Sequence, residues 1–190
     1  MRSAVLAVIV FLSNLSFAAD IDGFKFWSFG KDPMTSMVAP AKDHYKTGAI
    51  HILDDQGFAH AKFKVKIWGE MYTSLLQLSR ESELPVDISK SRWVEIEYAA
   101  NRIVTMQLRH AFTHGGTHNH VLLDDTDGHF VTVRISFSDF KGGLKPLDLT
   151  NVSKFDFAMV GKNESADFSE IKIKHLIIDG FNPQDARSNR

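Results

Sequence analysis

The sequence contains no cysteine, so no disulfide can hold its fold together and stability has to come from a packed core or a bound ion. It has no excess of positive charge, since 22 lysines and arginines stand against 23 aspartates and glutamates. Nucleic-acid-binding domains normally carry a strong basic excess, and we set that class aside. Tyrosine and tryptophan are scarce, with three of each.

Long hydrophobic runs are also missing. The apolar run from Ala4 to Leu12 is less than half of the roughly 20 residues that a bilayer-spanning helix needs. It follows Met1-Arg2-Ser3 and precedes small residues at Ser16-Phe17-Ala18-Ala19, which is typical of a secretory signal peptide. The sequence therefore predicts that residues 1–19 are removed, that the chain is secreted or periplasmic, and that it has no stable membrane insertion.

What the sequence does contain is short alternating runs of strand length, separated by Gly, Pro, Asn and Asp. Such a pattern predicts one all-β domain over residues 20–180, a sandwich or a barrel, with a polar tail over 181–190 that is expected to fray. The predicted strands are 23–29, 47–53, 58–68, 71–79, 92–99, 102–112, 118–123, 129–137, 152–160 and 169–179.

Two of these strands carry polar side chains on one face. Glu95 and Glu97 alternate with apolar residues in the first, and Gln107 and Arg109 do so in the second. A short turn separates the strands, so we expect them to pair as a hairpin and to form one outward polar patch.

Such a patch suits a sugar, because its hydroxyls need donors and acceptors that rigid strands hold in fixed directions. Aromatic rings stack on the apolar face of a sugar, and the candidates are Trp68, Tyr72 and Phe112. The alternative is ordinary cross-strand ion pairing between Glu97 and Arg109.

The segment 110–120 holds four histidines, at positions 110, 114, 118 and 120. Neutral imidazole is a good ligand for zinc or copper, and His118 and His120 fall on the same side of an extended segment, so His114, His118 and His120 are candidate metal ligands. The alternative is a solvated loop, in which His120 hydrogen-bonds a ligand or water.

Several segments resemble, in order and spacing, the galactose-binding-like jelly rolls that serve as carbohydrate-binding modules, particularly of families 11 and 30, and the related complex I intermediate-associated proteins. The resemblance spans roughly residues 57 to 180 and implies a two-sheet antiparallel jelly-roll β-sandwich. The segments are Pro85 to Ser89, Trp93 to Tyr98, Val104 to Arg109, His129 to Phe140, Leu147 to Val152 and Ile171 to Asp179.

The resemblance also implies a structural calcium ion where the first and last strands meet. Asp54 and Asp179 are the candidate ligands, because calcium is bound by several carboxylate and carbonyl oxygens. The alternative for Asp54 is a turn aspartate that bonds to its own backbone.

Signs of catalysis are few, since the sequence lacks a Gly-x-Ser-x-Gly elbow and a His-Glu-x-x-His helix. Three hypotheses follow. The preferred one is non-catalytic binding of a polysaccharide or oligosaccharide by an exported module, with a separate glycan-active enzyme as partner. The others are an exported metal-binding protein or metal-dependent enzyme centred on the histidines, and a protein-interaction module of the intermediate-associated type.

Overall fold

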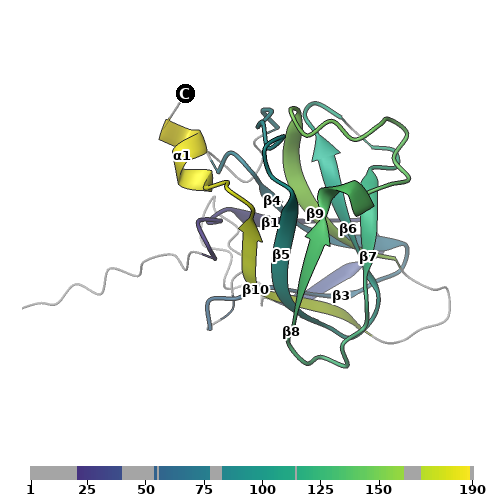
Figure 1. The fold of residues 1–190 in the computed structure, drawn as a ribbon. Coiled ribbons are helices and arrows are strands. Elements are labelled where there is room, and N and C mark those ends of the chain that lie inside the picture. The colour runs from purple at the N-terminus through teal and green to yellow at the C-terminus, as the bar shows by residue number, and fades with distance from the viewer. Residues whose placement is uncertain are drawn as a thin grey trace, which may run out of the picture.

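A computed structural model describes residues 21–39, 54, 56–77, 83–113, 115–160 and 168–188. These residues form two antiparallel five-stranded sheets that face each other as a sandwich (Figure 1). Strand order in the first sheet is β1-β4-β9-β6-β7 and in the second β2-β3-β10-β5-β8. The predicted all-β sandwich is confirmed.

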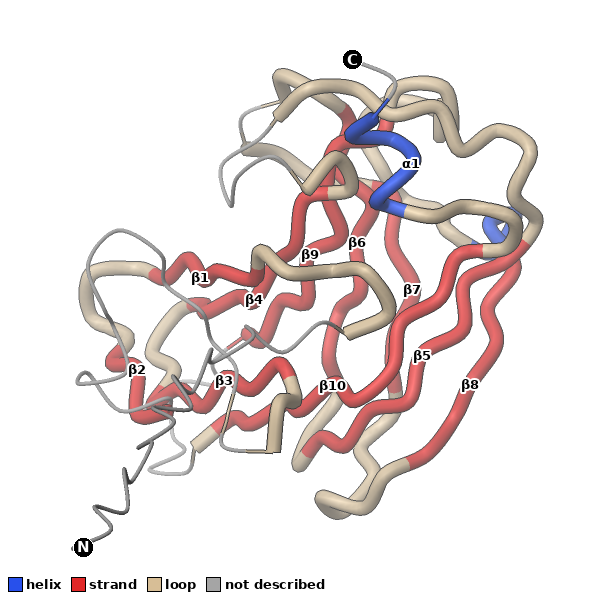
Figure 2. Tube along the Cα trace, turned by 90° about the vertical axis from the view of Figure 1, so that its left-hand side faces the viewer, coloured by secondary structure: helices blue, strands red, loops and turns tan. Residues whose placement is uncertain are grey.

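The first sheet consists of β1 (Trp27–Lys31), β4 (Trp68–Ser74), β9 (Val152–Val160), β6 (Val104–His110) and β7 (Asn119–Leu123). The second consists of β2 (Ser36–Ala39), β3 (Ala59–Lys64), β10 (Ser169–Ile178), β5 (Trp93–Ala100) and β8 (Val131–Ser136). A 3-10 turn follows β8 at Phe137–Asp139, and α1 (Pro183–Ser188) lies at one end of the sandwich (Figure 2). No helix in the described ranges is long and apolar enough to cross a bilayer.

The core lies between the sheets and comes from the alternation of apolar side chains along each strand. Val94 and Ile96 of β5 and Phe155 and Phe157 of β9 are fully buried, and the residues between them, such as Glu95 and Asp156, are on the opposite side of each strand. Trp27 is also fully buried, and its indole N–H donates to the Phe24 carbonyl at 3.0 Å, so its single polar group is satisfied.

Most predicted strands exist with small shifts at their ends, and β9 has the predicted bounds. Strand β2 was not predicted, because its four residues are too few to show a period. The predicted strand at 47–53 lies outside the described residues. The tail differs from the expectation over 181–188, since Phe181 and Ala186 pack against the core instead of fraying.

The predicted hairpin is wrong. Strand β5 pairs with β10 and β8, whereas β6 pairs with β7 and β9 in the other sheet. The short connection at 101–103 therefore crosses between the sheets. Alternation shows which side of a strand is buried. Two strands have the same alternating pattern whether they are hydrogen-bonded neighbours in one sheet or face each other across the core, so the pattern does not distinguish the two arrangements.

Candidate ligand-binding face

The outward side of the first sheet gathers polar and aromatic side chains from four strands. We call it the polar face. It consists of Trp68, Glu70 and Tyr72 on β4, Lys154 and Asp156 on β9, Gln107 and Arg109 on β6, and His120 on β7.

Strand register aligns the polar face into a row that crosses the whole sheet. Ser28 is opposite Tyr72, Tyr72 opposite Asp156, Asp156 opposite Gln107, and Gln107 opposite His120. Ser28 is buried, and neighbouring strands lie about 4.8 Å apart, so the part of the row that belongs to the polar face extends about 14 Å from β4 to β7. A row of that length suits an extended ligand better than a single small molecule.

An ion cluster lies at the centre of the polar face. Nη2 of Arg109 is 2.8 Å from Oδ2 of Asp156 and 3.7 Å from Oε1 of Glu70. The Asp156 side chain has no exposed surface, while Arg109 and Glu70 are slightly exposed. One guanidinium nitrogen of Arg109 therefore interacts with two carboxylates, and one of these, Asp156, is fully buried.

Burial governs the protonation of this cluster. It raises the pKa of Asp156 to about 7; Arg109 opposes the rise and the Glu70 carboxylate adds to it. Burial also raises the pKa of Glu70, against the attraction of Arg109 and Lys154. Both carboxyl groups therefore hold a proton more tightly than an exposed carboxyl group does, and Asp156 does so up to about neutral pH.

Lys154 extends the cluster along the face. Its ammonium lies 3.3 Å from Oε1 of Glu83 and 5.1 Å from the centre of the Tyr72 ring. The backbone of β1 also shapes the face, since a Cβ at Gly30 would lie 2.8 Å from Oε1 of Glu70 and 3.3 Å from Cζ3 of Trp68. A glycine at this position leaves room for both side chains.

The structure brings five of the candidate sugar-binding residues together on the polar face: Trp68, Tyr72, Gln107, Arg109 and His120. Phe112 lies in the turn beyond the end of β6, where it is exposed. Glu95 and Glu97 lie on the outer side of the second sheet, so the single patch that the sequence predicted does not exist.

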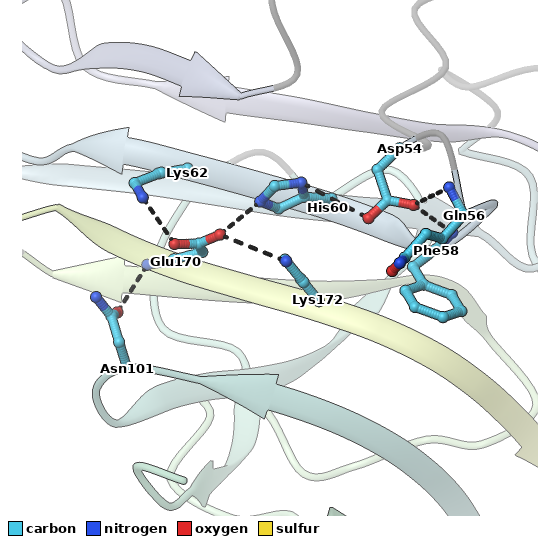
Figure 3. A network of polar contacts seen from close by, with 8 residues as sticks. All are labelled: Asp54, Gln56, Phe58, His60, Lys62, Asn101, Glu170 and Lys172. Atoms are coloured by element: carbon cyan, nitrogen blue, oxygen red, sulfur yellow. Dashed lines mark hydrogen bonds and ion pairs between the residues drawn. The ribbon is translucent and has the colours of Figure 1, made fainter. Parts of the chain in front are cut away.

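On that second outer face the carboxylates are paired with cations. Arg134 of β8 lies 2.7 Å from Glu95, and Lys174 of β10 lies 2.6 Å from Glu97. Cross-strand ion pairing was the predicted alternative, but the partner of Glu97 is Lys174 and not Arg109. Figure 3 shows a second group of polar contacts, on β3 and β10, where Glu170 accepts from His60 at 2.8 Å and from Lys62 at 2.9 Å.

The described histidines of the 110–120 segment do not converge. Nε2 of His110 accepts from the backbone N–H of Asp148 at 3.0 Å, and Nδ1 of His120 lies 3.0 Å from the His118 carbonyl oxygen. Burial lowers the pKa of His118, and nearby Arg109 lowers it further. His114 lies outside the described residues, among which no three side chains are placed to hold a metal ion. A zinc or copper site stays a prediction.

The candidate calcium ligands have protein partners. Oδ1 of Asp54 accepts from the backbone N–H groups of Gln56 and Phe58, as in the predicted turn alternative (Figure 3). Asp179 pairs with Arg92 at 2.8 Å. Calcium likewise stays a prediction.

Sequence reasoning missed Glu70, Lys154 and Asp156. Alternation offered a signal, because Phe155 and Phe157 point inward and their neighbours must then point outward. What alternation does not give is that β9 lies between β4 and β6, which is the arrangement that brings Arg109 to Asp156.

The fold and the polar face together define a β-sandwich whose first sheet has a polar outward side. No family model matches the sequence, and no curated protein does. Among solved structures, the family 11 carbohydrate-binding module of the cellulosomal cellulase Lic26A-Cel5E of Clostridium thermocellum is similar, with 20% identity, a TM-score of 0.51, and 83% of this chain and 92% of that chain covered. The predicted resemblance is thus confirmed in the fold.

Two further solved structures are similar in outline. One is the Clostridium thermocellum family 11 module in complex with a β-1,3-1,4-mixed-linked tetrasaccharide, with 19% identity, a TM-score of 0.49, and 82% of this chain and 92% of that chain covered. The other is a carbohydrate-binding module of family 29, with 12% identity, a TM-score of 0.42, and 67% of this chain and 72% of that chain covered.

Proposed function

We propose that the polar face binds a polysaccharide or oligosaccharide without catalysing a reaction on it. The observation that carries this proposal is the row of polar and aromatic side chains across the first sheet, in a fold shared with a carbohydrate-binding module. The face is built on strands, which hold donors and acceptors more rigidly than loops do.

The side chains of the polar face match the chemistry of a sugar. The amide of Gln107 both donates and accepts, and it makes no hydrogen bond within the described part of the chain. Trp68 is 38% exposed at the end of β4 and offers a ring for the C–H face of a sugar. Arg109 adds charged donors that its two carboxylates hold in place.

The same cluster argues against hydrolysis. A glycosidase needs two carboxyl groups that both reach the scissile bond. Asp156 has no exposed surface, and Arg109 lies between it and Glu70, so this pair has only one carboxyl group that meets a ligand. Binding without bond cleavage is the function that this arrangement supports.

We propose export as the setting of this function, from the signal-like residues 1–19, with a separate glycan-active enzyme as the natural partner. Edman sequencing of the protein from its native envelope should give a first residue near Asp20. An intact Met1 on the protein recovered from that source would contradict export by a cleaved signal.

The binding proposal is tested by native electrophoresis in gels that contain soluble mixed-linked β-glucan, xylan, galactomannan or agar oligosaccharides. At least one of these should retard the wild-type protein. Gln107→Ala should weaken the retardation, because a neutral hydrogen bond contributes about 0.5–1.5 kcal/mol, or roughly two- to tenfold in affinity.

The matched control is Glu97→Ala, an outward residue of the other sheet, which should bind as the wild type does. Retardation that Glu97→Ala abolishes and Gln107→Ala leaves unchanged would place the ligand on the second sheet and contradict the proposal.

A further inference from the structure

We propose that ligand binding by the polar face is linked to one proton: the complex forms with Asp156 as a neutral acid, and affinity falls as pH rises through neutrality. This inference rests on the proposed function. It assigns to Asp156 a positioning role, exerted through Arg109.

The first observation is the geometry of Asp156 on the central strand of the sheet. The side chain has no exposed surface, and its Oδ1 makes no hydrogen bond within the described part of the chain. Oδ2 faces Nη2 of Arg109 at 2.8 Å, and the Nε–H of the same guanidinium is also without a partner there. An ionised carboxylate in such a place is poorly solvated.

The second observation is the balance of charge. The described groups that face the cluster from β4, β6, β9 and the segment before β5 include three carboxyl groups and two cations: Glu70, Glu83, Asp156, Arg109 and Lys154. Lys154 pairs with Glu83, so Asp156 and Glu70 share the single guanidinium of Arg109. A proton on Asp156 removes the repulsion between these two carboxylates, and the raised pKa of Asp156 agrees with that location.

Ligand binding changes the surroundings of Asp156 and so makes the affinity for the ligand depend on its protonation. A glycan on the face covers Arg109 and Glu70, which are 18% and 16% exposed, and removes the water that still screens them. Asp156 gains nothing in return, because a sugar hydroxyl cannot reach a side chain with no exposed surface. Loss of water disfavours the ionised acid, so binding strengthens the hold on the proton, and by linkage the protonated face binds more tightly.

Protonation also changes what Arg109 offers. With Asp156 ionised, Nη2 is attracted to two carboxylates at 2.8 and 3.7 Å. With Asp156 neutral, only one of them competes with the ligand for the guanidinium donors. Both effects act in the same direction, toward tighter binding at lower pH.

Other titrating groups near the face need controls. Tyr72 packs near Lys154, and His120 is in the same row as Asp156. His118 faces Arg109, but burial and that cation lower the pKa of His118, which favours its neutral form at neutral pH. His120→Gln is therefore the variant that separates a histidine effect from the proposed one.

The first test needs no ligand. The Asp156 carboxyl carbon, followed by carbon-13 NMR against pH, should titrate near neutrality. Titration of Asp156 below pH 5 overturns the proposal whatever the protein binds.

The second test is calorimetry with the polysaccharide that retards the protein most strongly, at pH 6 to 8.5 and in two buffers of different ionisation enthalpy. The wild type should take up protons on binding near pH 7.5. A pKa that rises by half a unit on binding gives an affinity about threefold higher at pH 6 than at pH 8.5. Asp156→Asn, which resembles the neutral acid, should bind with the low-pH affinity at every pH and take up no proton.

His120→Gln and Asp127→Asn should keep the pH dependence of the wild type. Proton uptake that persists in Asp156→Asn, or a loss of affinity in that variant, overturns the proposal. Binding with no pH dependence overturns only the proton linkage, whereas no binding to any polysaccharide overturns the proposed function and this inference with it. If Asp156→Asn does not fold, the carboxyl titration and the two-buffer calorimetry on the wild type still decide.

Discussion

Replacement of Arg109 by methionine should destabilise the protein strongly, and more so at high pH. The sequence predicts Arg109 as a residue of an outward polar patch, but its ion pair with a fully buried carboxylate makes it part of what stabilises the fold. Removing one partner of a buried pair costs about 3–5 kcal/mol. For a chain of 150–250 residues this corresponds to a fall in Tm of roughly 6–20 °C.

The pH dependence follows from the sign of the pKa shift. In the folded wild type the pKa of Asp156 is raised to about 7, above its ordinary acidic value in the unfolded chain. The contribution of this proton to the free energy of unfolding is fully present at pH values below the pKa of Asp156 in the unfolded chain. It is lost as pH rises toward 7. Without Arg109 the folded pKa rises further and the loss continues to higher pH, so the variant and the wild type should differ more at pH 8 than at pH 5.

Urea unfolding at both pH values measures the difference, with m-values to check that the variant unfolds in one step. The double variant Arg109→Met/Asp156→Asn should recover much of the loss, because the fully buried carboxylate is removed together with its partner. A cost below about 1 kcal/mol at pH 8, or one that does not change with pH, would refute the reasoning about this cluster.

Three other predictions concern single residues. Gly30→Ala should lower Tm and weaken glycan binding together, because its Cβ would lie 2.8 Å from Oε1 of Glu70; loss of neither, by thermal melting and calorimetry, would contradict the close approach. Arg134→Ala should cost at most about 1 kcal/mol in urea unfolding, because this partner of Glu95 is 57% exposed. Glu170→Gln should destabilise at pH 7 and less below pH 4: the lysine and histidine pairs outweigh burial and lower the pKa of Glu170, so the stability that they give is lost as pH falls through that pKa. A pH-independent cost would contradict this.

Sequence patterning predicted the secondary structure and the buried side of most strands, because alternation with a period of two is visible within each strand. Val94 and Ile96, which alternate with the outward Glu95 and Glu97, face the core, and so do Met106 and Leu108, which alternate with Gln107 and Arg109. The pairing between strands was not predicted correctly. The turn before β6 suggested a hairpin, but the apolar sides of β5 and β6 meet across the core.

The same limit explains the outcome for the site. Tyr72, Gln107 and Arg109 were recognisable as outward polar or aromatic residues, and the structure gathers them on one face. Their position around Asp156 depends on β9, which pairs with β4 and β6 from far along the chain. Long-range pairing of this kind is set by the packing of the whole sandwich, and no local pattern encodes it.

The central claim, that the polar face binds a glycan, is tested most directly by two-dimensional NMR of the labelled protein titrated with the polysaccharide that retards it. Backbone amides of β4, β6 and β9 and the side-chain amide of Gln107 should shift in a saturable way, while those of β5 and β8 stay in place. Shifts confined to β5, β8 and β10, or no shifts with any polysaccharide of the panel, would contradict the account.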